Sequence, residues 1–68
     1  MAEKTFKIIE VCGVSGESYA QATRNAVSKA SQTVRHIDWF EVVSQRGFVR
    51  EGKVAEFQVT LKLGFQLE

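Results

Sequence analysis

Polar and apolar residues alternate almost without exception between residues 53 and 67. This alternation is typical of a β-strand with one buried face and one exposed face. The apolar face carries Ala55, Phe57, Val59, Leu61, Leu63, Phe65 and Leu67. The opposite face carries Glu56, Gln58, Thr60, Lys62, Gly64 and Gln66. The pattern therefore predicts a strand that packs one side against a core and leaves the other side available for binding.

A strand and a helix are predicted ahead of this long strand. β-forming residues dominate residues 4–12, with apolar side chains on both faces, and Gly13 is expected to end the strand. Small and apolar residues then recur at helical spacing, which predicts a helix that runs to about His36. Ser15 is placed to act as its N-cap, because its hydroxyl can accept a hydrogen bond from an unpaired amide of the first turn.

Residues 37–49 are predicted to form another strand, and Glu51 and Gly52 a two-residue hairpin turn into the long strand. With this turn, the residue numbers of cross-strand partners add up to 103. The resulting pairs are Trp39–Gly64, Phe40–Leu63, Glu41–Lys62, Val42–Leu61, Val43–Thr60 and Gln45–Gln58. The same register places Arg46 on the apolar side, from which a β-bulge would release it.

The length of the chain bounds its architecture. Sixty-eight residues with one cysteine form a single domain, residues 1–68, without an internal disulfide. A domain of this length buries only about 60% of its unfolded surface. A straight strand of about 15 residues spans about 50 Å, whereas a compact domain of this size is on the order of 30 Å across. The long strand must bend or extend into a neighbour, so we expect a homo-oligomer.

The net charge and the absence of several motifs argue against some classes of function. Nine Lys and Arg residues against eight Asp and Glu residues leave a formal net charge of +1, which argues against a nucleic-acid partner. No apolar run suits a membrane span or a signal peptide, so we expect a cytoplasmic protein. Residues 13–16 lack the lysine of a phosphate-binding loop. No carboxylate pair or metal-ligand cluster suggests catalysis, and we interpret His36, Asp38 and a buried Cys12 as structural.

Trp39 is a large aromatic residue on the less apolar face, where it has no core to fill. It is expected either to stack on a flat ligand or to pack against a neighbouring subunit, and the pattern leaves both interpretations open. Glutamines on this face favour a heterocyclic ligand, because an amide both donates and accepts hydrogen bonds. Arg46 suits a phosphate or carboxylate tail, or a charged position on the rim of the sheet.

A set of residues spread over nearly the whole chain carries a family resemblance. It comprises Cys12-Gly13-Val14-Ser15, Asp38-Trp39-Phe40-Glu41-Val42, Arg46-Gly47, Gly52, Val54, Phe57-Gln58-Val59, Lys62, Gly64-Phe65 and Leu67-Glu68. Together with the chain length, this set resembles the dodecin family. The resemblance implies an α+β subunit of β-α-β-β order, in which a three-stranded antiparallel sheet partly wraps around one helix. It also implies that twelve copies assemble into a hollow homododecamer.

The resemblance further implies a flavin site at two-fold subunit interfaces, where two flavins stack between symmetry-related tryptophans. Trp39 takes the stacking position, Gln58 binds the isoalloxazine edge, and Arg46 meets a phosphate or ribityl tail. The expected site residues are Trp39, Gln58, Arg46, Asp38, Phe40, Ser44 and Gln66. FMN is the expected ligand and coenzyme A a further candidate. Riboflavin and lumichrome compete with FMN, because Gln66 replaces an arginine that some bacterial relatives carry.

The function implied by the resemblance is flavin storage and buffering with photoprotective quenching. Turnover is not expected, because two flavins stacked between two indoles leave no open position for a substrate. A structural homo-oligomer with a vestigial ligand site is the first alternative, and an enzyme that uses the bound flavin for redox turnover is the second.

Overall fold

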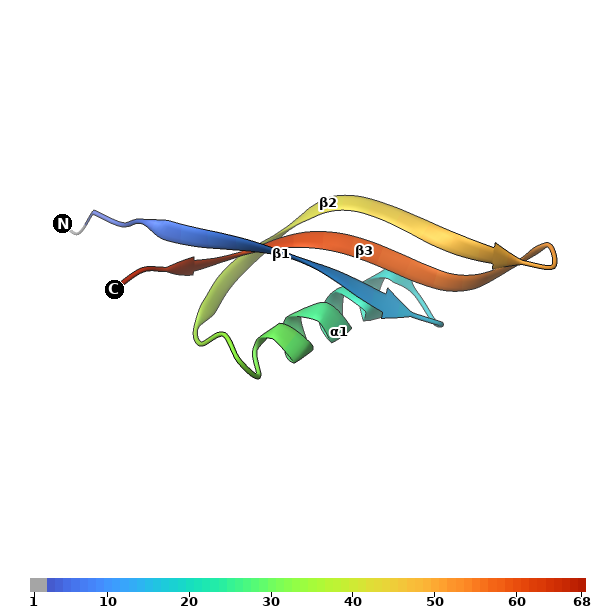
Figure 1. Ribbon diagram of the computed structural model, residues 1–68, viewed down its shortest axis with the longest axis horizontal. Coiled ribbons are helices and arrows are strands. Elements are labelled where there is room, and N and C mark those ends of the chain that lie inside the picture. The colour runs from blue at the N-terminus through green and yellow to red at the C-terminus, as the bar shows by residue number, and fades with distance from the viewer. Residues whose placement is uncertain (1–2) are drawn as a thin grey trace.

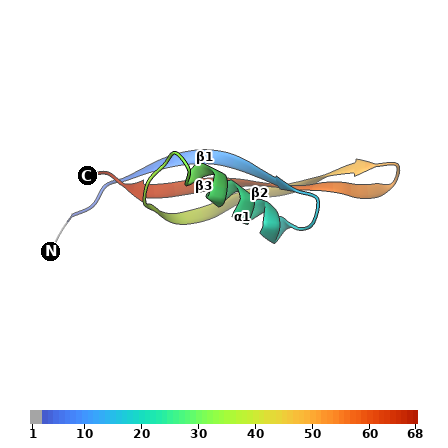
Figure 2. The ribbon, with the colours of Figure 1, turned by 90° about the horizontal axis from the view of Figure 1, so that it is seen from below.

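The structure, a computed structural model, describes residues 3–68 and has the order β1, α1, β2, β3 (Figure 1). The elements are β1 (Phe6–Ser15), α1 (Tyr19–Ala30), β2 (Ile37–Arg50) and β3 (Lys53–Gln66). The strands form one antiparallel sheet in the order β1-β3-β2, and α1 lies against one of its faces (Figures 1 and 2). The predicted α+β fold with β-α-β-β order is therefore confirmed. Within residues 3–68, α1 is too short and too polar to span a membrane.

The alternation along β3 separates the core from an open face. Val59, Leu61 and Leu63 are fully buried, and they pack with Ala22 and Ala26 of α1. Burying an aliphatic side chain of this size contributes about 1.5–3 kcal/mol, so these three dominate the core. The sheet face turned away from α1 is called the outer face, and β3 contributes to it Gln58, Thr60, Lys62 and Gly64.

Gly13 allows α1 to approach β1 closely. A Cβ atom at this position would lie 2.8 Å from Cβ of Ala26 and closer still to the carbonyl oxygen of Ala22. The strand runs past Gly13 to Ser15, because residues 13–15 still pair with β3, and the predicted strand end at Gly13 is wrong. The glycine is required here for a close helix–strand contact and does not interrupt the strand.

The N-cap of α1 is Ser18, and the prediction of Ser15 is wrong. The hydroxyl of Ser18 accepts a hydrogen bond from the amide of Gln21 at 2.9 Å. Ser15 is instead the last residue of β1, and its Oγ accepts from the amides of Glu17 at 2.9 Å and Ser18 at 3.4 Å. Ser15 therefore organises the turn that leads into the helix, while Ser18 satisfies the helix terminus itself.

The helix ends at Ala30, which is earlier than the predicted end near His36. Residues 31–34 form hydrogen-bonded turns that follow the last helical residues, including a bond from the Val34 amide to the Ala30 carbonyl at 2.9 Å. His36 then adopts a positive φ of 60°. The hydroxyl and β-branched residues in this segment have low helix propensity, and the left-handed residue directs the chain into β2.

The β2–β3 hairpin turns at Glu51 and Gly52, as predicted. Both residues have positive φ, 53° and 76°, as a type I′ turn requires. The predicted register is confirmed for Trp39–Gly64, Phe40–Leu63, Glu41–Lys62 and Val42–Leu61. A bulge at Val43 then shifts the register, so the predicted Val43–Thr60 and Gln45–Gln58 pairs are wrong, and the actual pairs are Ser44–Thr60, Gln45–Val59 and Arg46–Gln58. The bulge turns Arg46 to the outer face.

The molecule is elongated, with principal extents of 55 × 20 × 14 Å and a radius of gyration of 14.2 Å. The β2–β3 hairpin projects well beyond the end of α1 (Figure 1). Phe48, Val49 and Val54 on this projection are 49%, 71% and 61% exposed. The long strand thus extends past the helix instead of bending back, and an exposed apolar patch of this kind marks a contact surface.

Candidate functional site

The outer face carries two groups of candidate binding side chains at opposite ends of the sheet. The first group, called the tryptophan end, consists of Phe6, Trp39, Gly64 and Gln66. The second group, called the arginine end, consists of Cys12, Ser44, Arg46, Gln58 and Thr60. All three strands contribute to each end, so the sheet itself holds the arrangement.

At the tryptophan end, the indole of Trp39 lies across Gly64. A Cβ atom at Gly64 would lie 2.7 Å from Cδ2 of the indole and closer still to Cε2 and Cζ2. Phe6 of β1 packs beside the ring, with a centroid distance of 6.0 Å and an interplanar angle of 57°. Trp39 remains only half-buried in this position. Gly64, which has no side chain, and the neighbouring Phe6 therefore hold the partly exposed indole of Trp39 on the outer face.

At the arginine end, the guanidinium of Arg46 lies along the sheet surface. Its Nη2 donates to Oγ of Ser44 at 3.0 Å, and its Nη1 donates to Oγ1 of Thr60 at 3.3 Å. Nη1 also donates to Oε1 of Gln58 at 3.5 Å. These neighbours come from β2 and β3, and the shifted register between the bulge at Val43 and the irregularity at Phe48 and Val49 places Arg46 beside them. The result is a cationic and amide-bearing surface that suits a polar ligand.

Cys12 belongs to this arginine end, contrary to the prediction that it is buried. The thiol is exposed, and its Sγ lies 3.9 Å from Oε1 of Gln58 and 4.0 Å from Nη1 of Arg46. Cys12 pairs with Thr60 across β1 and β3, which puts it on the outer face. The sequence left open which face of β1 meets the core, because both faces are apolar. The structure shows that Ile9 and Val11 pack on the core.

Five of the predicted site residues lie within these two ends: Trp39, Ser44, Arg46, Gln58 and Gln66. Gln66 pairs with Phe6 at the tryptophan end. It is eight residues from Gln58 along β3, roughly 26 Å, so one chain does not bring Gln66 to Arg46. Asp38 is exposed at an irregularity in the β2–β3 ladder.

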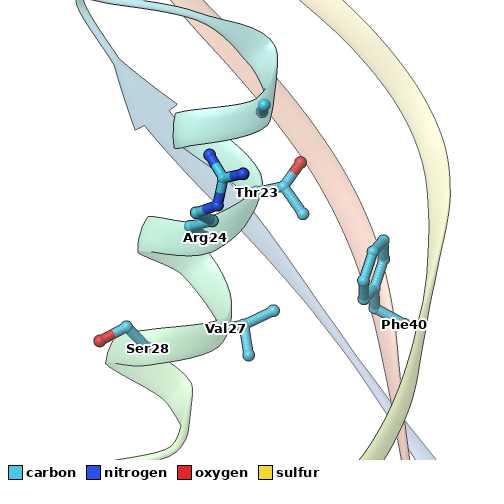
Figure 3. A pocket seen from close by; sticks show the side chains of 6 residues that line it. Thr23, Arg24, Val27, Ser28 and Phe40 are labelled. Carbon is cyan, nitrogen blue, oxygen red and sulfur yellow. The ribbon is translucent and has the colours of Figure 1, made fainter.

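Phe40 is not brought together with Trp39. It pairs with the buried Leu63, so it lies on the sheet face that carries α1. Figure 3 shows its ring across a groove from Thr23 and Val27 of the helix. This groove has a volume of about 560 Å³ and is lined by Ala20, Thr23, Arg24, Val27, Ser28 and Phe40.

The groove between α1 and β2 arises because the helix packs mainly on β1 and β3. This groove was not predicted, because the position of the helix over the sheet depends on contacts between elements that are far apart in the chain. Among residues 3–68, no group of three or more His, Cys, Asp and Glu side chains is placed to hold a metal ion.

Comparison with known proteins agrees with this architecture. The dodecin family model matches residues 5–68. The dodecin of Thermus thermophilus is 45% identical over 65 residues, which cover 96% of this chain and 94% of that protein. The solved dodecin of Streptomyces coelicolor is 53% identical with a TM-score of 0.94, covering 100% of this chain and 97% of the other.

A more distant solved relative binds a metal. The calcium dodecin of Mycobacterium tuberculosis, described as calcium chelating with a novel calcium-binding site, is 29% identical with a TM-score of 0.81. The match covers 94% of this chain and 91% of that one. The family model, the sequence identities and the shared fold agree over nearly the full length. This chain belongs to the dodecin family.

Proposed function

We propose that this protein stores and buffers flavin by holding it between the outer faces of two copies of the chain. Membership of the dodecin family supports, in general terms, a small flavin-binding protein. The observation that carries the proposal is the half-buried indole of Trp39, which Gly64 and Phe6 seat on the outer face. A stacked aromatic pair contributes about 0.5–1.5 kcal/mol beyond its buried area.

The spacing of the two ends favours a site shared between copies. Trp39 pairs with Gly64, whereas Arg46 pairs with Gln58. These positions are six residues apart on β3, about 20 Å, which exceeds the length of one isoalloxazine ring. Around a two-fold axis, the outer faces of two copies run in opposite directions, so the tryptophan end of one copy meets the arginine end of the other.

The charges midway between the two ends are compatible with this pairing. Lys62 on β3 lies in register with Glu10 on β1 and Glu41 on β2. The centre of the outer face therefore carries both signs of charge. Two copies can meet there with each lysine close to carboxylates of the other, and repulsion between like charges is reduced.

Each proposed contact has a distinct role toward the ligand. Trp39 stacks on the isoalloxazine, and Gln58 of the opposite copy binds its polar edge. Arg46 and Ser44 face the tail, where the guanidinium offers charge-assisted hydrogen bonds to the phosphate of FMN. Gln66 offers an amide without a charge, so riboflavin and lumichrome compete with FMN. Asp38 flanks Trp39, while Phe40 lies on the opposite face of the sheet, across the groove from α1, and is assigned no contact with the flavin.

Stacking also accounts for photoprotection without turnover. An indole in contact with an excited flavin donates an electron and takes it back, so the bound flavin loses its fluorescence and its photochemistry. Two flavins stacked between two tryptophans leave no open position for a substrate beside the ring. We place this storage role in a cytoplasmic homododecamer.

The proposal is tested by titrating riboflavin with purified protein and following flavin fluorescence. Wild-type protein is expected to quench the emission. Trp39→Ala is expected to bind at least tenfold more weakly, because it removes the apolar surface that the ligand buries as well as the stacking contact. It is also expected to quench less, because it removes the electron donor. Trp39→Phe should retain part of the binding but less of the quenching. If Trp39→Ala binds and quenches riboflavin as well as wild type does, the stacking proposal is wrong.

The alternative function is a structural homo-oligomer with a vestigial ligand site. The exposed apolar side chains of the hairpin projection favour assembly whether or not a ligand binds. This alternative predicts a stable oligomer that is purified colourless and takes up no riboflavin or FMN from solution. The same titration therefore separates the two functions.

A further inference from the structure

We infer that Arg46 is a positioning residue that orients the amide of Gln58, so that the amide nitrogen is presented to the ligand as a hydrogen-bond donor. The inference rests on the proposed flavin site and assigns the polarity of its edge contact. It gives Arg46 a role that does not depend on a phosphate tail.

The chemistry of Arg46 selects one of the two orientations of the amide. A guanidinium has only donors, whereas a glutamine amide has an accepting oxygen and a donating nitrogen. Nη1 of Arg46 lies 3.5 Å from Oε1 of Gln58, and turning the amide over would bring two donors together. The thiol of Cys12, also a weak donor, lies 3.9 Å from the same oxygen. Two donors from different strands therefore converge on Oε1.

The guanidinium is itself held against the sheet. Nη2 donates to Oγ of Ser44 at 3.0 Å, and Nη1 donates to Oγ1 of Thr60 at 3.3 Å. A planar group with several fixed N–H bonds can satisfy three acceptors at once, which the single ammonium of a lysine does not match. These contacts lie on the exposed face and hold the guanidinium beside Gln58, where it donates a hydrogen bond to the amide oxygen.

The consequence is a defined hydrogen-bonding polarity for the site. Among residues 3–68, Nε2 of Gln58 has no acceptor, while its Oε1 is occupied. The ligand must therefore offer an acceptor at this point, such as a carbonyl oxygen or an unprotonated ring nitrogen of an oxidised flavin. An edge that presents an N–H group is disfavoured there, because it would face the N–H groups of the amide.

A charge-neutral ligand and a double-mutant cycle distinguish positioning from phosphate binding. Dissociation constants for riboflavin and FMN are measured by fluorescence titration for wild type, Arg46→Lys, Gln58→Ala and the double variant. Positioning predicts that Arg46→Lys weakens riboflavin, which has no phosphate, by roughly 3- to 10-fold, the size of one hydrogen bond, and weakens FMN by at least the same factor. It also predicts little further loss from Arg46→Lys when residue 58 is already alanine.

A second pair of variants tests the donor directly. Gln58→Glu removes the N–H groups but keeps an acceptor for Arg46, so it should lose affinity for both flavins by a factor similar to that for Gln58→Ala. Gln45→Glu is the matched control, because Gln45 is exposed, pairs with Val59 on the α1 side of the sheet and introduces the same charge. It is expected to bind both flavins as wild type does.

The outcomes separate the inference from the proposed function. A loss confined to FMN in Arg46→Lys, or a riboflavin loss that adds fully to that of Gln58→Ala, would overturn the positioning role alone. Wild-type affinity for both flavins in Gln58→Glu would overturn it as well. Failure of the wild-type protein to bind either flavin would overturn the proposed function and the inference together. Circular dichroism and gel filtration of each variant establish that the sheet and the assembly are retained.

Discussion

Adding a methyl group at Gly64 is expected to displace the indole of Trp39 and weaken flavin binding. A Cβ atom there would lie 2.7 Å from Cδ2 and closer still to two other ring carbons. Carbon atoms pack at about 3.5–4.0 Å, so the ring must move by about 1 Å or more. Because Trp39 is half-buried and can swing outward, we expect Gly64→Ala to cost no more than about 1 kcal/mol of stability, the low end for overpacking.

The effect on the ligand is larger, because the displaced ring occupies the stacking position. Losing a stacked pair worth about 0.5–1.5 kcal/mol corresponds to a loss of affinity of roughly 2- to 12-fold. Riboflavin fluorescence titration measures this change. Gly16→Ala is the matched control, since a Cβ at Gly16 meets nothing within 4 Å. If Gly64→Ala and Gly16→Ala bind riboflavin equally well, the seating of Trp39 on Gly64 has no role in binding.

Three further predictions follow from other contacts. Gly13→Ala pushes a Cβ into the backbone carbonyl of Ala22, so it should lower the unfolding free energy by about 1–3 kcal/mol. A thermal melt of the variant that matches wild type at the same protein concentration would contradict this. Val49 is 71% exposed on the hairpin projection, and Val49→Asp places a charge there. We expect this variant to form a lighter assembly in light scattering while its circular dichroism spectrum is retained. An unchanged mass would show that the projection is not an interface. Gln66→Arg should raise the affinity for FMN relative to riboflavin by roughly tenfold through a charge-assisted hydrogen bond, and an unchanged ratio of the two dissociation constants would remove residue 66 from the tail site.

The fold could be predicted wherever one local pattern determined one structure. The alternation along residues 53–67 has only one interpretation as a strand with a buried face, and Val59, Leu61 and Leu63 are fully buried. Glu51 and Gly52 form the predicted turn. A two-residue hairpin of type I′ needs two positive φ values, of which Gly52 adopts one without strain and Glu51 adopts the other. These features depend on neighbours in sequence, so the sequence alone determined them.

The register of residues 44–48 could not be predicted by counting from the turn, because one irregularity between Phe48 and Val49 shifts the pairing and the bulge at Val43 restores it. Val42 and Val43 are both apolar, so hydrophobicity did not indicate which of them would leave the regular ladder. The one signal was Arg46, which the uninterrupted register placed on the apolar side. The bulge resolves this conflict and pairs Arg46 with Gln58, so an unfavourable position for a charge marked the irregularity.

The helix boundaries were misplaced for a related reason. Ser15 and Ser18 are both good N-caps, and local preference does not choose between them. The choice depends on how far β1 continues, which is set by its pairing with β3 and by the contact of Gly13 with α1. Both contacts join residues that are far apart in the chain, and the sequence pattern shows only that a glycine lies at position 13.

The candidate site was predicted in its residues but not in its arrangement. Trp39 and Gln58 were identified on one face of the hairpin, where the structure places both. The contact of Phe6 with Trp39 and the exposure of Cys12 were missed. Both depend on which face of β1 meets the core, and apolar residues on each face left that undecided.

We propose above that assembled copies of this chain hold flavin on their outer faces. Sedimentation velocity of the protein saturated with FMN, detected in the visible absorption band of the flavin, tests it most directly. We expect the flavin to sediment with one species near 91 kDa, twelve times the 7.6 kDa of a single chain, at one flavin per chain. Flavin that stays unsedimented while the protein moves without it, or protein that sediments as a single chain, would contradict the claim.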